Sequence, residues 1–235
     1  MAKVKPSLIE QTGAVGDRVI YTRFGKQFSR SRAKSFTDKR SEAQLRQRAL
    51  FKAIQHTASI LGSAIQRGLA KVAHDHGRVE NNEFASINKE CFAYEEGKVR
   101  IDYPRLRIAE GLVTKVDFTR CSVDGLHVEL EFDPGSNVTH AHPDDVVFVY
   151  AVEFEEEVCQ LVACVERRTG IAAFDLPDIR EEAGKPVDYH LYAIVEAANT
   201  ACISTLSPDE KKADKGHRNV DRRVSPSVYI GAVKV

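Results

Sequence analysis

The sequence has few cysteines and no long apolar run. Its five cysteines are odd in number and scattered along 235 residues without a CxxC pair, which argues against both a disulfide framework and a zinc site. We expect them to be reduced and mostly buried. No stretch approaches the roughly 20 apolar residues that span a bilayer, and the N-terminal residues lack the apolar segment of a signal peptide. The expected location is the cytoplasm, with no membrane partner.

Common catalytic motifs are missing as well. The chain contains no G-x-S-x-G nucleophile elbow, no P-loop and no G-x-G-x-x-G dinucleotide fingerprint. We therefore predict no catalytic residue, no metal, no cofactor and no small-molecule substrate. The expectation is a protein that is not an enzyme.

The composition is that of an ordinary globular protein, but its charge is divided unevenly. Lys and Arg together number 34, as do Asp and Glu, so the net charge is zero. Residues 1–78 nevertheless hold 16 basic and 5 acidic residues, which leaves 18 basic and 29 acidic residues for the remainder. Such asymmetry favours a polyanion-binding half, or equally two halves or two copies that attract each other. Composition alone does not choose between them.

The basic part opens with a predicted β-hairpin. Residues 18–23 and 26–34 are rich in β-forming side chains, and Phe24-Gly25 between them supplies a residue that tolerates a turn. The period of two along the second strand places Phe28 with a row of cations on one face, namely Arg30, Arg32 and Lys34.

A long amphipathic helical region follows the hairpin. The run Ser41-Glu42-Ala43-Gln44 matches a capping box, so a helix is predicted to start here. Apolar residues then recur at three-and-four spacing to about residue 73, and we expect two helices that meet near Gly62. His74, His76 and Gly77 indicate a helix C-terminus. A further short helix is predicted over 83–92 with Asn82 as its cap.

Beyond Tyr103-Pro104 the pattern changes to short strands separated by turns. Seven strands are predicted, at 112–119, 126–132, 146–154, 158–166, 170–176, 189–195 and 227–235. The predicted fold class is therefore α+β, with an N-terminal β-hairpin and helices followed by a seven-strand antiparallel β-sandwich. The expected domains are a basic hairpin-plus-helix region at 1–104 and a β-sandwich domain at 105–235.

Two resemblances accompany these patterns. The N-terminal part of the sequence resembles the signature of an uncharacterised bacterial family seen mainly in Bacteroidota, through Gly16, Val19, Tyr21, Gly25-Lys26, Arg30 and the run 40–48. Similar N-terminal segments occur in some prophage-encoded proteins. The family's pattern continues through Asn88-Lys89, 101–103, 108–111 and 225–231, whereas the charged insertion 207–223 departs from it. The resemblance implies a family without an established activity, so it assigns no catalytic residue.

The sandwich part is similar to fibronectin type III and immunoglobulin-like domains. The segment from Leu176-Pro177 to Tyr189 resembles the turn and the corner tyrosine that enter the sixth strand of such domains. The core tryptophan usual in these domains is absent, and Phe132 is expected to fill its volume.

The cations of the basic part are the candidate site. Near a helix N-terminus they could hold phosphates, and Phe28 and Phe36 could stack on bases. The candidate polyanion-binding residues are Arg30, Arg32, Lys34, Arg40, Arg46 and Arg48. The alternative is that these side chains cover a solvent-exposed face or pair with acidic residues.

Two histidine-rich motifs are weaker candidates. The run His140-Ala141-His142-Pro143-Asp144-Asp145 holds possible zinc or manganese ligands, but it lies in a predicted loop without a distant ligand. A polar loop is the simpler interpretation, both here and for His74 and His76.

The sequence as a whole favours an interaction or assembly protein that binds a protein partner or a second copy, with nucleic-acid binding by the basic segment as the alternative.

Overall fold

The structure is a computed structural model that describes residues 2–3, 12–23, 26–32, 38, 40–135, 140–179, 186–198 and 223–235. The chain divides into two compact units, Met1–Leu45 and Arg46–Val235, which we call the N-terminal unit and the main unit. The sequence predicted a domain boundary between 104 and 105. In the structure, residues 46–104 belong to the same compact unit as the sandwich.

The N-terminal unit is built on a small antiparallel sheet. Its strands are β1 (Ala2–Lys3), β2 (Gly13–Val15), β3 (Arg18–Arg23) and β4 (Lys26–Ser31), in the order β1-β4-β3-β2. The predicted hairpin is confirmed in β3 and β4, although β4 ends at Ser31. Its turn at Phe24-Gly25 lies outside the described residues, as does Lys34. The outer strands β1 and β2 are additions to the prediction.

The helices follow the predicted starts and breaks closely at first. They are α1 (Glu42–Ile60), α2 (Gly62–Gly68), α3 (Ala70–Asp75) and α4 (Glu80–Asn88). The capping box is formed, because Ser41 N–H donates to Gln44 Oε1 at 3.2 Å and Gln44 N–H donates to Ser41 Oγ at 3.4 Å. The helix break expected near Gly62 is confirmed.

The fourth helix corrects the prediction at both ends. It starts at Glu80 rather than after Asn82, with Val79 as the extended cap residue and Glu80 and Glu83 in its first turn, where acids favour the helix dipole. It ends at Asn88 rather than Phe92. A 3₁₀ turn η1 (Lys89–Cys91), a hairpin of β5 (Phe92–Glu95) and β6 (Lys98–Ile101), and a second 3₁₀ turn η2 (Tyr103–Arg105) follow.

Seven further strands form two antiparallel sheets in the main unit. One sheet has the order β11-β8-β7 and the other β10-β9-β12-β13. The strands are β7 (Asp117–Asp124), β8 (His127–Asp133), β9 (Val146–Glu153), β10 (Val158–Glu166), β11 (Ile171–Asp175), β12 (Asp188–Glu196) and β13 (Val228–Lys234), with a 3₁₀ turn η3 (Arg167–Thr169) after β10.

All seven predicted strands therefore exist, and the first of them is displaced. The strand predicted at 112–119 lies later in the sequence, at 117–124. The tight connection at Gly125 pairs Asp124 with His127 and so fixes the position of β7. Leu112 lies outside the strand and is 85% exposed. The loop 207–222 lies outside the described residues.

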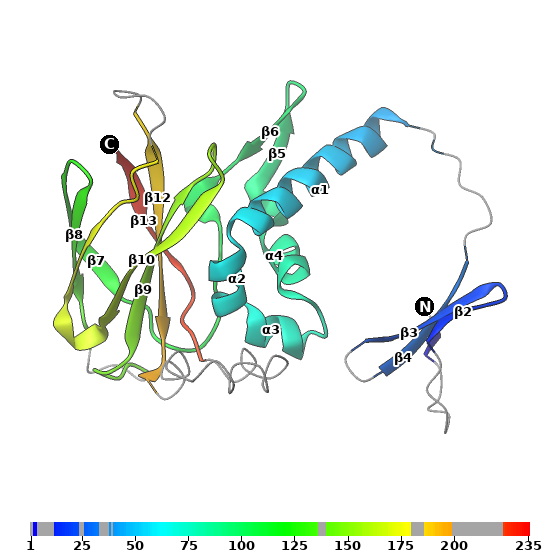
Figure 1. The fold of residues 1–235 in the computed structure, drawn as a ribbon, viewed down its shortest axis with the longest axis horizontal. Coiled ribbons are helices and arrows are strands. Elements are labelled where there is room, and N and C mark those ends of the chain that lie inside the picture. Colours follow the sequence, from blue (N-terminus) through cyan, green and yellow to red (C-terminus); the bar gives the residue numbers. More distant parts are fainter. Residues whose placement is uncertain are drawn as a thin grey trace. The chain divides into compact units, whose positions relative to one another are not determined.

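The central strands β9 and β12 of the four-stranded sheet are buried on both faces, so the main unit has three layers. The inner face of this sheet packs on the three-stranded sheet through side chains such as Val149 and Leu191, which meet Val128 and Leu130. Its outer face packs on the helices in a second apolar cluster (Figure 1). The members of that cluster from the sheet are Phe148, Tyr150, Val152, Tyr192 and Ile194, and those from the helices and the short breaks between them include Ala58, Leu61, Ile65, Leu69 and Phe84.

Because the helices cover this outer face, residues 46–104 share an apolar core with the sheet. The shared core joins the helices and the sandwich into one compact unit. In the described part of the chain, no helix is both long and apolar enough to cross a membrane.

Cysteine burial differs from the expectation. The four cysteines that the structure describes are free, as expected, but only Cys91 is buried. Cys159 is half-buried, while Cys121 and Cys164 are exposed. In Cys159 burial outweighs a hydrogen bond with Ser63 and raises the pKa of the thiol to about 11, so the thiol stays protonated at neutral pH.

Candidate functional site

The strongest candidate surface lies on one face of the N-terminal sheet. The register pairs Val19 with Arg30 and Tyr21 with Phe28, and paired residues of antiparallel strands lie on the same face. The ladder continues one step further, because Arg32 N–H donates to Asp17 O at 2.7 Å, which returns Arg32 to the side of Arg30.

We call this surface the aromatic-basic face and define it by Val19, Tyr21, Phe28, Arg30 and Arg32. The rings of Tyr21 and Phe28 stack across the strands with centroids 5.7 Å apart and planes 22° from parallel. Both rings are half-buried, whereas Arg30 and Arg32 are exposed. The face therefore combines an aromatic pair with two solvated cations.

The six predicted polyanion-binding residues do not lie on one body. Arg30, Arg32 and Arg40 belong to the N-terminal unit, whereas Arg46 and Arg48 lie on α1 in the main unit. Lys34 is outside the described residues. The structure brings only Arg30 and Arg32 together on one sheet face.

The other three cations have neighbours of their own. The Arg40 side chain is 78% exposed and lies 3.7 Å from the Asp38 carboxylate through its Nε. The Arg46 guanidinium lies 5.7 Å from the centre of the Tyr94 ring. Arg48 is exposed on the same helix. The start of α1 is also less available to phosphate than the sequence suggested, because the capping box already uses the Gln44 N–H.

The motif at 140–145 has a structural role centred on Asp145. This carboxylate is buried, and it accepts hydrogen bonds from His142 N–H at 2.8 Å and from Ala198 N–H at 3.2 Å. The fully buried Arg167 lies beside it, with Nε 3.9 Å from Asp145 Oδ2, and donates to Thr114 O. Burial lowers the pKa of Arg167, and the negative charge of Asp145 opposes that effect. Asp145 and Arg167 thus join four connections: the segment before β7, the β8–β9 and β10–β11 connections, and the segment after β12.

The histidines of this motif line a shallow pocket. His140 and His142 are exposed and border a space of about 460 Å³ together with Val113, Ala141, Asp145, Ala197, Ala198 and Arg223. Within the described residues, no group of three His, Cys, Asp or Glu side chains could hold a metal ion. His76, which directly follows α3, also has a structural contact, since its Nδ1 lies 2.9 Å from the buried Glu83 carboxylate.

A buried ion pair between α2 and the sheet was missed in the sequence. Arg67 pairs with Glu196, donates through Nε to Tyr150 Oη at 3.0 Å, and lies 3.8 Å from the centre of the Phe148 ring. Burial would lower the pKa of Arg67, but the charges of Tyr150 and Glu196 and their hydrogen bonds raise it overall. The only sequence signal was an acidic residue at the end of the apolar run of β12. The Glu196 side chain is 1% exposed and the Arg67 side chain 16% exposed, so this largely buried pair links α2 to the sheet.

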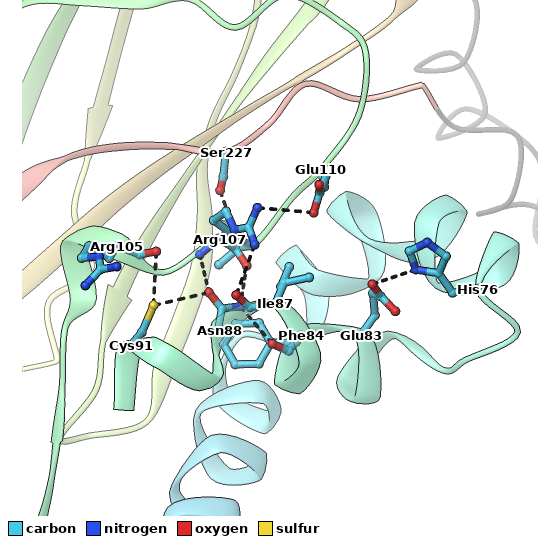
Figure 2. A network of polar contacts seen from close by, with 11 residues as sticks. His76, Glu83, Phe84, Ile87, Asn88, Cys91, Arg105, Arg107, Glu110 and Ser227 are labelled. Atoms are coloured by element: carbon cyan, nitrogen blue, oxygen red, sulfur yellow. Dashed lines mark hydrogen bonds and ion pairs between the residues drawn. The ribbon is translucent and has the colours of Figure 1, made fainter. Parts of the chain in front are cut away.

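Asn88 joins distant segments through its side-chain amide (Figure 2). Its Nδ2 donates to Phe84 O at 3.1 Å and to Arg107 O at 2.9 Å, while its Oδ1 accepts from Arg107 N–H at 2.7 Å. One residue further on, Ile108 N–H donates to Ser227 Oγ at 3.0 Å. The extended segment 105–110 is thereby held between α4 and the start of β13.

The same contacts join three segments that lie far apart in the sequence, at Asn88, Ile108–Ala109 and Ser227, since Ser227 N–H also donates to Ala109 O at 3.1 Å. The space beside Gly111 is filled by Val224, so no larger residue fits there. The contacts of Asn88, Gly111 and Ser227 are thus packing and hydrogen-bond contacts within the fold.

Comparison of the chain with protein-family models, with curated proteins and with solved structures gives no match. The surface chemistry described above is therefore the basis for a functional proposal.

Proposed function

We propose that this chain is a non-enzymatic interaction protein in which the N-terminal unit docks on a partner and the main unit serves as its scaffold. One observation carries the proposal: among the described side chains of the N-terminal sheet, none is buried. A sheet needs a covered apolar face to be stable. The N-terminal sheet therefore gains stability when a partner covers it.

The size of this sheet supports the same conclusion. Its strands have two, three, six and six residues, and its most apolar side chains, Val19, Ile20, Tyr21 and Phe28, are only half-buried. Residues 1–45 carry ten Lys or Arg against four Asp or Glu. A small, cationic sheet with half-buried aromatic side chains suits a surface that binds rather than a domain that folds alone.

The main unit has the features of a rigid scaffold. Both faces of its central strands β9 and β12 are covered, and its two apolar clusters lie on opposite faces of the four-stranded sheet. As part of the proposal we assign the seven strands to the fibronectin type III or immunoglobulin-like type. Tyr189 supports this assignment, because it is buried and its O–H donates to Pro177 O, as a corner tyrosine does. Phe132 is buried between the sheets in place of a tryptophan.

We also propose membership of the uncharacterised Bacteroidota family. The run 40–48, the most specific part of the resemblance, supports this.

Hydrogen exchange of the full chain tests the docking role. We expect backbone amides of β3 and β4 to exchange quickly in dilute monomeric protein, while those of β9 and β12 stay protected and act as the internal reference. Protection of β3 and β4 should then rise in concentrated protein or after addition of a polyanion. Strong protection of β3 and β4 in the dilute monomer, confirmed by light scattering, would contradict the proposal. Failure to gain protection under any of these conditions would contradict it too.

A further inference from the structure

We propose that the aromatic-basic face binds single-stranded nucleic acid, with a base stacked on the Tyr21–Phe28 pair and the adjoining phosphates held by Arg30 and Arg32. This inference rests on the proposed docking role of the N-terminal unit, and it names the partner of that unit by its chemistry.

The position of the two rings carries the first step. Tyr21 lies on β3 and Phe28 on β4, and these are the two central strands of the sheet. Their rings are nearly parallel, 22° apart, and both are partly open to solvent. Aromatic side chains on the central strands of a four-stranded antiparallel sheet are an arrangement on which unpaired bases stack. Stacking accepts any base, because every base has a flat π-face.

The cations supply the second step. Arg30 is two residues beyond Phe28 on the same strand, so it lies on the same face about 7 Å away. Both Arg30 and Arg32 are exposed. A phosphate that adjoins a base stacked on Phe28 would lie within reach of these guanidinium groups, which bind phosphate with two parallel hydrogen bonds.

The shape of the face distinguishes a single strand from a duplex. Base edges of a duplex are read by an element that enters a groove, such as a helix or a protruding ribbon. The aromatic-basic face presents rings on the strands of a sheet, which suit unstacked bases. A second copy of this chain would bind the cations through its carboxylates, and such binding would not require two parallel rings beside them.

Fluorescence anisotropy of the full chain with a labelled oligo-thymidylate tests the inference. A duplex of equal length and inorganic polyphosphate, which has charge but no bases, are the comparison ligands. The variants are Phe28→Ala, Phe28→Tyr, Arg30→Gln and Arg18→Gln. Arg18 is the matched control, because it is an exposed arginine of the same sheet whose register with Ser31 places it on the opposite face.

We expect the oligonucleotide to bind more tightly than the duplex or polyphosphate, with an affinity that falls as salt rises from about 50 to about 200 mM. Phe28→Ala should weaken binding about 5- to 150-fold, and Phe28→Tyr should preserve it. Arg30→Gln should make the slope of log affinity against log salt shallower by about 0.7, whereas Arg18→Gln should leave most of the slope.

Three results would overturn the inference. They are an absence of salt-sensitive binding, equal affinity for polyphosphate and oligonucleotide, and equal effects of Arg30→Gln and Arg18→Gln. If nucleic acid does not bind but β3 and β4 gain protection in concentrated protein, the inference is wrong while the proposed docking role stands, with a second copy as the partner.

Discussion

Gly68 is the position at which a single methyl group should disturb the main unit most. A Cβ at Gly68 would lie 2.5 Å from Ala109 Cβ and 2.7 Å from Ala109 Cα, and closer still to the carbonyl oxygen of Ile108. That segment has little room to retreat, because Asn88 and Ser227 hold it by hydrogen bonds on either side. Gly68→Ala therefore forces α2 or the segment to move.

The size of the effect follows from three contributions. Displacement of a packed segment costs about 1–3 kcal/mol, and loss of the hydrogen bond from Glu110 N–H to Gly68 O, 3.1 Å long, adds about 1 kcal/mol. The better helix propensity of alanine returns at most about 1 kcal/mol. The expected net loss in the free energy of unfolding is about 2 kcal/mol.

Gly62→Ala is the matched control, because Gly62 begins the helix that Gly68 ends. No atom lies within 4 Å of a Cβ placed there, so the substitution should stabilise the protein by up to about 1 kcal/mol. Urea unfolding followed by far-ultraviolet circular dichroism suits a chain without tryptophan. The melting temperature of Gly68→Ala should fall by about 4–8 °C. A midpoint for Gly68→Ala equal to or above that of Gly62→Ala would refute the reasoning.

Three further predictions concern the polar contacts of the main unit. Asn88→Ala should lower the free energy of unfolding by about 2–4 kcal/mol, since it leaves the backbone N–H and C=O of Arg107 without their buried partner; chemical denaturation beside Lys89→Ala, an exposed neighbour, checks this. Arg67→Met should cost about 3–5 kcal/mol by leaving the buried Glu196 carboxylate without its cation, and the double change with Glu196→Gln should recover much of the loss in a double-mutant cycle. Burial lowers the pKa of His190, and the charges of Asp188 and Glu153 oppose this effect. The contribution of His190 to the free energy of unfolding is therefore complete above about pH 6.5 and is lost as the pH falls below that value. His190→Gln should flatten this pH dependence of stability, and an unchanged pH profile would contradict the prediction.

Local patterns in the sequence predicted most of the elements. The capping box at Ser41 and the turn at Gly125 depend on residues next to each other in the chain, and both are present in the structure. The hairpin of β5 and β6 was missed although its pattern is local. The helix predicted over 83–92 included Phe92, which is the first residue of β5, whereas the helix ends at Asn88.

The packing of the helices was harder to predict, because it depends on contacts between distant segments. The signal was present in β9 and β12, whose apolar residues run almost without interruption instead of alternating. Such runs are typical of strands that are buried on both faces. A sandwich with one solvent-exposed outer face would have shown alternation there.

The candidate site depended on register in the same way. Alternation along one strand grouped Phe28 with Arg30 and Arg32, and the structure agrees. The pairing of Phe28 with Tyr21 required the register between two strands, which the sequence left open. Charge counting could not separate Arg46 and Arg48 from the other cations either, because the division at Leu45 falls inside a continuous helix.

The double burial of the four-stranded sheet also governs the order in which the main unit can be made. Its helices leave the ribosome first, yet the apolar side chains of α2 and α4 are covered only when the later strands β9 (Val146–Glu153) and β12 (Asp188–Glu196) are available. The last hydrogen bonds to the segment at Ile108 come from Ser227. Until the later strands are made, the apolar faces of the helices in a nascent chain stay exposed. Folding of the main unit is therefore expected to finish after synthesis and to benefit from chaperones that bind apolar helix faces.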